Sequence, residues 1–275
     1  MKKKAIGWII FTVVLFYACI SLYPLIWVVL QSFKTETEFL QSIWSLPTSF
    51  NLKNFSVALS KGAIGSSFLI SVRNTVATVT VDLVFITLAG YAFSKMKMKG
   101  KRFFYYLILL NMLIPTPIIL LPMYLQILDM RIQNTIWAIV FPYFQGFAPL
   151  GILLITNYFD NIPNEVIEAA RIDGCSTAGI LTRMVVPLAK PMLVTLAILG
   201  GMNTWNEYMW ALTSISDTQK YPLSIAVAIL KDKTSIIGYT PVFAALTISA
   251  MVFVILYLLA QKTFVQSITS GAVKG

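Results

Sequence analysis

Long apolar stretches separated by short polar segments dominate the sequence. Five runs contain no Asp, Glu, Lys or Arg, and a further run is interrupted by a single carboxylate. A transmembrane helix needs about 20 mostly apolar residues to cross roughly 30 Å of hydrocarbon. The pattern therefore predicts an all-α integral membrane protein with six transmembrane helices in one domain, residues 1–275. The predicted spans cover about residues 8–30, 69–94, 103–128, 134–158, 187–213 and 242–262.

Composition agrees with this pattern. Hydrophobic residues make up 57% of the chain and charged residues 12%, and the mean hydropathy is +0.78. Soluble domains carry about 25% charged residues, because charge covers their surface. Much of the surface must therefore face hydrocarbon, and an intrinsically disordered chain is excluded.

The positions of the charges indicate how the spans are oriented. The 21 Lys and Arg against 11 Asp and Glu give a net charge of +10, which in a soluble protein would suggest a nucleic-acid partner. Thirteen of the 21 cations lie at the N-terminus, in Lys95–Arg102, around residues 160–190 and in the tail. Because cations accumulate in cytoplasmic loops, both termini are expected in the cytoplasm and no nucleic acid is expected to bind.

Few residues could support catalysis or metal binding. The chain has no histidine and two cysteines, Cys19 and Cys175, which lie far apart in sequence. Disulfide frameworks and zinc clusters need more closely organised ligands. We therefore expect a protein that is not an enzyme, with no catalytic residue, no metal site and membrane lipid around it.

One inner loop, residues 160–187, is longer and more polar than a connection in a six-helix bundle requires. It predicts two short helices joined by a turn. Pro163 suits a helix start, Gly174 can end the first helix in the left-handed conformation, and Ser176 can cap the second. Glu165 and Glu168 place negative charge near the positive end of the first helix dipole.

The first of these helices can form a compact knob. Ala169 and Ala170 would let another surface approach closely, and Ile172 offers an apolar anchor. Glu168 can pair with Arg171, three residues on. A knob attached to two spans could transmit movement from a soluble partner, whereas an ordinary helical hairpin without a partner fits the composition equally well.

The motif EAARIDG, followed by nine residues and then MVVP, resembles the EAA loop of permease subunits of binding-protein-dependent ABC importers. Met184 and Val186 replace the Ile and Leu of that pattern, and Cys175 stands where a small residue is usual. The resemblance implies that this loop couples the permease to ATPases. The residues carried over are Glu168, Ala169, Ala170, Arg171, Asp173, Gly174 and Pro187.

The resemblance continues along nearly the whole chain and narrows to the sugar-importer, MalG-like branch. The segments that carry it are SLPTSFNLKNF, NTVATVTVDLVFITLAGYAFSKMKMKG, LIPTPIILLPMYLQILDMRIQNT, NTWNEYMWAL and the tail QKTFVQSITSGAVKG. It implies the type I ABC importer permease fold in a bacterial cytoplasmic membrane. The tail residues expected to face the ATPases are Gly271, Ala272 and Lys274.

The same resemblance implies a set of partners. A second homologous permease would complete the pathway as a heterodimer, two ATP-binding subunits would grip the EAA loops, and an extracytoplasmic sugar-binding protein would deliver di- or oligosaccharides. The chain contains no G-x-x-x-x-G-K-[ST] phosphate loop. It is therefore expected to bind no cofactor, and ATP with Mg would be held by the partner ATPases.

Polar residues near the fifth span are candidates to line the pathway. Asn203, Trp205, Asn206 and Tyr208 combine amides with aromatic faces, a combination suited to sugars, although an aromatic belt at the membrane interface is an equal alternative. Further pathway candidates are Asp82 and Asn111. For Asp82 a structural role between helices is favoured, because sugar transport driven by ATP needs no proton relay.

Prolines and glycines indicate where helices bend or touch. Pro115, Pro117 and Pro122 are expected to kink the third span. The pair Gly200 and Gly201 favours close helix contact.

Three other functions stay open at this level. Cargo of the glycerol-3-phosphate type is carried by close relatives of the sugar branch. An ion-coupled secondary transporter would need buried ionisable groups, for which the sequence offers Asp82 near mid-membrane depth. An intramembrane enzyme would need a clustered nucleophile and base, which the sequence does not supply.

Overall fold

The computed structural model describes residues 2–272 of the chain, with side chains described at 6–259 and 261. All regular elements in this part are helical. The α-helices are α1 (Lys2–Ser32), α2 (Glu36–Gln41), α3 (Lys53–Lys61), α4 (Ile64–Lys95), α5 (Lys101–Leu110), α6 (Thr116–Asp129), α7 (Trp137–Asp160), α8 (Asn164–Ile172), α9 (Thr177–Ile180), α10 (Val186–Leu188), α11 (Lys190–Asn206), α12 (Met209–Ser214), α13 (Leu223–Asp232), α14 (Thr234–Ile237) and α15 (Thr240–Ala272). Short 3-10 turns occupy Asn111–Leu113 and Thr218–Lys220, and a π-helical turn occupies Leu181–Val185.

Four helices are long and apolar enough to cross a membrane, and two bent helix pairs raise the number to six if each pair forms one span. The four uninterrupted segments are Ile6–Ser32, Ile64–Lys95, Trp137–Asp160 and Thr240–Leu259. The bent pairs are Lys101–Leu113 with Thr116–Asp129, at 104°, and Thr177–Leu188 with Lys190–Asn206, at 79°.

The chain turns much more sharply at Pro115 than a kinked single helix would. Ile114 has an extended backbone with ψ of 114°, because the residue before a proline avoids the helical region. Pro117 then occupies the first turn of α6, where its missing N–H costs no hydrogen bond. The range 103–128 thus contains two helices. The range 187–213 is likewise divided among α10, α11 and α12.

By its internal contacts the chain divides into two compact units. The first comprises residues 1–68 and 225–252, and a polar network ties its segments together. The Glu36 carboxylate accepts backbone N–H groups from Tyr239 at 2.9 Å and Thr240 at 3.0 Å, at the start of α15. The amide of buried Asn54 donates to the carbonyl of Lys34 at 2.7 Å and accepts from the Thr240 hydroxyl at 3.1 Å.

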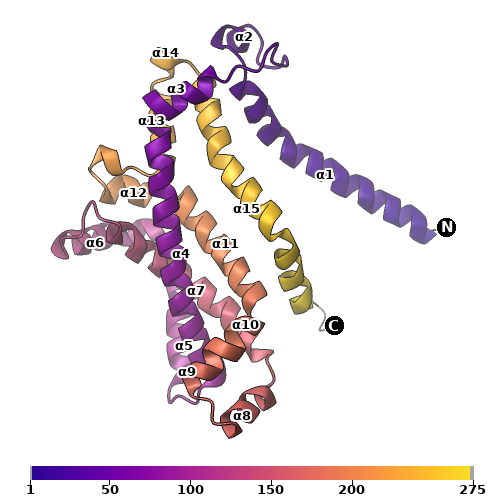
Figure 1. Ribbon diagram of the computed structural model, residues 1–275, viewed down its shortest axis with the longest axis vertical. Coiled ribbons are helices and arrows are strands. Elements are labelled where there is room, and N and C mark those ends of the chain that lie inside the picture. Colours follow the sequence, from indigo (N-terminus) through magenta and orange to yellow (C-terminus); the bar gives the residue numbers. More distant parts are fainter. Residues whose placement is uncertain (1, 273–275) are drawn as a thin grey trace. The chain divides into compact units, whose positions relative to one another are not determined.

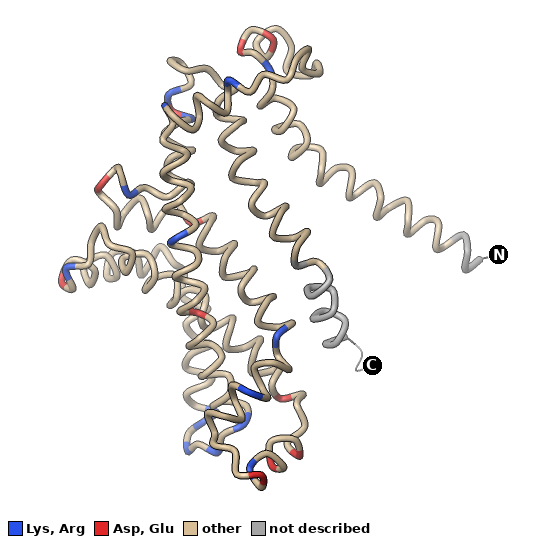
Figure 2. The backbone as a smooth tube through the Cα atoms, viewed as in Figure 1, with Lys and Arg blue, Asp and Glu red and all other residues tan. Residues whose placement is uncertain are grey.

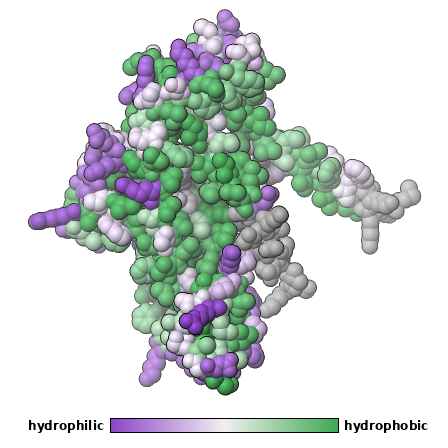
Figure 3. Space-filling model, in the orientation of Figure 1, coloured by the Kyte–Doolittle hydropathy of each residue, from purple (hydrophilic) through white to green (hydrophobic). Residues whose placement is uncertain are grey.

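The second unit comprises residues 69–224 and 253–275. Figure 1 shows the helices α4, α7, α8, α9 and α11 of this unit. Buried side chains from these five helices form its core. Glycines allow α4 and α7 to approach closely, since a Cβ added at Gly90 or Gly151 would lie 2.3 Å from Ile155 or Ile86 respectively. Charged residues gather at the end of this unit that holds α8 and the α4–α5 loop (Figure 2). Away from this charged end, the surface seen in Figure 3 is mainly hydrophobic.

Candidate functional site

The EAA segment, residues 160–187, folds as two helical pieces joined by a tight turn. Gly174 ends α8 with φ of +79°, in the left-handed region, as the sequence predicts. The backbone N–H of Cys175 donates to the carbonyl of Ala170 at 2.9 Å, and that of Gly174 donates to Arg171 at 3.1 Å. These two bonds form a Schellman motif, which satisfies carbonyls left free at a helix end. The Ser176 hydroxyl accepts the N–H of Gly179 and caps α9, which is also as predicted.

The two faces of α8 have opposite environments. Ile167 and Ala170 are both 4% exposed and belong to the core of the unit. Glu168 and Ala169 are exposed, and Ile172 is 87% exposed. The expectation that Ala169 and Ala170 share an accessible surface is therefore wrong for Ala170, which packs inward because the helix period of 3.6 residues turns it toward Ile167.

The predicted ion pair between Glu168 and Arg171 does not form. Among the described residues the structure contains one ion pair, between Lys220 and Asp217. Glu168, Arg171 and Asp173 instead present their charges to solvent around Ala169 and Ile172. Exposed pairs at this spacing contribute only a few tenths of a kcal/mol, so their absence leaves the fold intact and the charges free for a partner.

Hydrogen bonds fasten the EAA segment to the end of α4. The Lys95 ammonium donates to the carbonyl of Ile162 at 2.7 Å and to the side-chain oxygen of Asn164 at 3.0 Å. The Ser94 hydroxyl donates to a carboxylate oxygen of Asp160 at 2.5 Å. Pro187 lies beyond the π-helical turn, exposed in α10. Because Ile162, Ile167 and Ala170 are also core residues, α8 is held rigidly against the span helices.

A second feature is an open groove of about 520 Å³ between α7 and α11. Asn203 and Asn206 lie exposed within it, and the rest of its wall is apolar except for Glu207. Asn203 and Asn206 stand one helical turn apart on α11, so their amides can contact one solute together. The lining residues, hereafter the α7–α11 groove, are Gly146, Phe147, Leu150, Leu199, Met202, Asn203, Asn206 and Glu207.

The residues that follow or separate these two asparagines have other environments. Trp205 is 5% exposed and its ring meets Phe253 edge-on at 6.1 Å, so it does not line the α7–α11 groove. Tyr208 is exposed beyond the end of α11, outside the residues that line the groove. Glu207 accepts the backbone N–H of Trp210 at 2.7 Å and so caps α12, which explains a carboxylate at this position. The sequence does not single out Phe147 as a groove residue, because α7 is apolar along most of its length.

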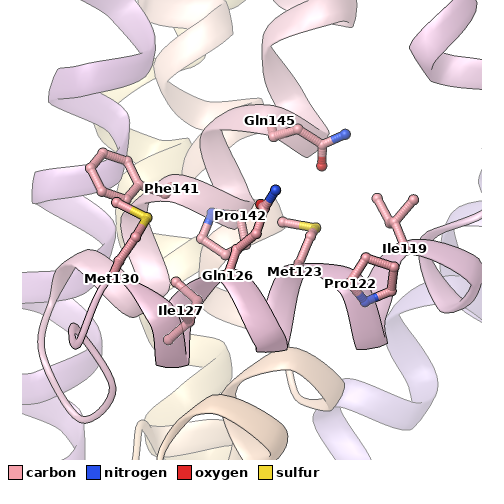
Figure 4. A pocket seen from close by; sticks show the side chains of 9 residues that line it. All are labelled: Ile119, Pro122, Met123, Gln126, Ile127, Met130, Phe141, Pro142 and Gln145. Atoms are coloured by element: carbon pink, nitrogen blue, oxygen red, sulfur yellow. The ribbon is translucent and has the colours of Figure 1, made fainter.

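Asp82 and Asn111 do not join the groove. Asp82 is 1% exposed, and a Cβ added at Gly200 would lie 3.3 Å from its carboxylate. Asn111 accepts a hydrogen bond from the Gln145 amide at 2.8 Å. Gln145 lines a separate pocket of about 340 Å³ between α6 and α7, where Met123 and Gln126 point toward Pro142 (Figure 4).

The tail residues expected to face ATPases lie at the limit of the described chain. Gly271 and Ala272 close α15, but their side-chain environments lie outside the described residues. Lys274 lies outside the described residues altogether.

Known proteins resemble this chain over most of its length. It is 37% identical, over all of its own residues and 91% of the relative, to "Probable ABC transporter permease protein YurM" of Bacillus subtilis (strain 168). It is 31% identical, over the full length of both chains, to "Arabinooligosaccharides transport system permease protein AraQ" of Halalkalibacterium halodurans. It is 29% identical, over 94% of its length and 93% of the relative, to "Melibiose/raffinose/stachyose import permease protein MelC" of Bacillus subtilis (strain 168).

A solved structure shares the fold. The chain matches, with a TM-score of 0.63 over 96% of both chains and 14% identity, a chain of a bacterial ABC transporter involved in the import of the acidic polysaccharide alginate. Residues 83–270 match the family model described as "Binding-protein-dependent transport system inner membrane component". This match includes α8, the Schellman turn at Gly174 and the α7–α11 groove, and it confirms the family to which the sequence resemblance pointed. The chain belongs to this family of membrane-embedded ABC transporter permeases.

Proposed function

We propose that this chain is the permease subunit of an ATP-driven importer for di- or oligosaccharides. Relatives whose printed names include arabinooligosaccharides, melibiose, raffinose, stachyose and diacetylchitobiose support the substrate class. The α7–α11 groove supports it chemically, because amides beside an apolar wall suit the hydroxyl groups and ring faces of sugars. The chain itself catalyses no reaction and binds no cofactor, and ATP with Mg is held by partner subunits.

The subunit assembles with a second, homologous permease and two ATP-binding subunits, and an extracytoplasmic sugar-binding protein docks on this complex. It lies in the bacterial cytoplasmic membrane with both termini in the cytoplasm. The cation-rich loop between α4 and α5 supports this topology. A heterodimer of permeases completes the pathway, of which the α7–α11 groove is one wall.

The observation that carries the proposal is the two-sided environment of α8. Its inner side chains are fixed in the core, while Glu168, Ala169 and Ile172 project outward. A small residue between a charge and an apolar side chain lets a partner surface approach closely, and the rigid attachment passes movement to α4 and α7. The ATP-binding subunits therefore dock on this outer face.

Cys175 offers a direct test of that docking. It is exposed in the Schellman turn, and Cys19 can be replaced by serine to leave it as the single thiol. Assembly with the ATP-binding subunits should slow maleimide labelling of Cys175 by about ten-fold, because thiol reactivity requires access. A matched control carries Cys175→Ser and Gln219→Cys, an exposed site on the other side of the proposed membrane, and should label at the same rate in both states. Equal labelling of Cys175 before and after assembly would refute docking here.

The groove is tested by substituting its two amides. Asn203→Ala combined with Asn206→Ala should lower sugar uptake by about ten-fold or more, because each lost hydrogen bond to a solute costs about 0.5–1.5 kcal/mol. Uptake of radiolabelled oligosaccharide into vesicles measures the change, with complex assembly checked by co-purification. Thr213→Ala, at another polar position nearby, is a control expected to leave uptake unchanged. Normal uptake by the double variant would remove the groove from the pathway.

A further inference from the structure

Three cations near the EAA segment have no partner among the residues that the structure describes. Lys97, Lys99 and Arg102 are exposed, and within the described chain none of them makes a hydrogen bond or an ion pair. Two other cations of the same loop are engaged: Lys95 holds Ile162, and Lys101 donates to the carbonyl of Ser94 at 3.1 Å. Lys95 and Lys101 therefore stabilise the fold, whereas the other three cations are available to an external ligand.

The free cations alternate with apolar side chains. Met96 and Met98 are exposed in the non-helical stretch between α4 and α5. Methionine is flexible and apolar, so this pattern suits the boundary between headgroups and hydrocarbon better than open water.

An apolar stripe continues directly from this loop along α5. Its members, more than half exposed, follow helical spacing and are Phe103, Tyr106, Leu107 and Leu110. The opposite side of α5 packs on the core through Tyr105 and Ile108. The ten residues of α5 extend about 15 Å, roughly half of the ~30 Å hydrocarbon thickness, which is the length available to one acyl chain.

Arg102 gives the helix itself no benefit. It stands in the first turn of α5, where no acidic residue is present and where the helix dipole disfavours a cation. The rule that cations mark the cytoplasmic side explains positive charge in this loop. It does not explain why a cation stands in the first turn of α5, next to the apolar stripe. An external anion would compensate this positive charge.

We propose that the α4–α5 loop and the α5 stripe form a binding site for an anionic phospholipid. The phosphodiester binds Lys97, Lys99 and Arg102, while one acyl chain lies along the stripe that begins at Phe103. The choice of a phospholipid over a soluble phosphate rests on the continuity of the cations with the apolar stripe. The inference rests on the proposed membrane topology, which places this loop at the inner surface.

The test measures lipid selectivity of the assembled complex in phosphatidylcholine vesicles. Spin-labelled phosphatidylglycerol should associate at least about five-fold more strongly than spin-labelled phosphatidylcholine, the factor expected from a single cation near an anionic headgroup. The variant K97Q/K99Q/R102Q should lose this preference. K97R/K99R should keep it because charge is conserved, and K53Q/K231Q/K233Q, which removes three exposed cations elsewhere, should keep it too.

Several outcomes would overturn the proposal. They are equal association of the two lipids with the unmodified complex, unchanged selectivity in K97Q/K99Q/R102Q, and loss of selectivity on adding millimolar inorganic phosphate, which would indicate a soluble-anion site. Co-purification of the partner subunits and an unchanged melting temperature of the complex confirm that each variant is inserted and folded. Selectivity is scored without transport, so failure here leaves the sugar-importer proposal standing, and failed uptake by groove variants leaves the lipid site standing.

Discussion

Replacing Gly174 by valine should reduce sugar uptake by the assembled importer at least about ten-fold. The backbone at this position has φ of +79°, and a side chain there would have open space around it. The effect must therefore come from the backbone. The left-handed conformation costs about 1–3 kcal/mol for a residue unsuited to it, and 1.4 kcal/mol corresponds to a factor of ten. Valine would break the Schellman turn and change the direction in which α8 leaves the core.

Gly174→Asn is the matched control, because asparagine tolerates the left-handed region. It should retain most of the uptake and most of the sugar-stimulated ATP hydrolysis, while the valine variant loses both and still inserts in the membrane. Equal transport by the two variants would show that the orientation of α8 is unimportant for coupling.

A second large effect is expected where α4 and α7 touch. A Cβ added at Gly151 would lie 2.3, 3.0 and 3.3 Å from three atoms of Ile86, and Ile86 is fully buried. Rotation of one terminal methyl group cannot relieve all three contacts. Gly151→Val should therefore destabilise the complex by about 1–3 kcal/mol and lower its melting temperature by on the order of 5 °C.

Gly146→Val provides the comparison on the same helix. An added Cβ at Gly146 meets nothing within 4 Å, so it shares the change in helix propensity without the overpacking. Thermal unfolding of the purified complex measures both variants. A similar melting temperature for Gly151→Val and the unmodified complex would mean that α4 and α7 can separate at this point without cost.

The sequence predicts local features of the EAA segment well. The left-handed turn at Gly174 and the cap at Ser176 depend on the chemistry of one or two residues and their immediate neighbours. Such features are largely independent of the rest of the fold, so they can be read before any packing is known. The motif that indicated the family lies in the same segment.

Features that depend on packing were less accessible. The sequence indicates kinks near Pro115, but the 104° bend results from combining an extended Ile114 with a new helix that starts at Thr116. Because apolar residues occur on every side of α11, the sequence does not reveal that Trp205 is buried while Asn206 is exposed. The inward position of Ala170 similarly depends on which side of α8 meets the core.

Helix α7 reaches both candidate sites. Leu150 lines the α7–α11 groove, and Phe159 is fully buried in the core that holds the EAA segment. The prolines inside α7 precede Leu150, so the nine residues that follow form an uninterrupted rod of about 14 Å. A stiff rod behaves as a lever: under the proposed docking on α8, a displacement of the EAA segment reaches the α7–α11 groove without rearrangement of the side chains between them. The ratio between the displacements of the two ends of this rod is then fixed by the point at which it pivots on α4, near the contact of Gly151 with Ile86.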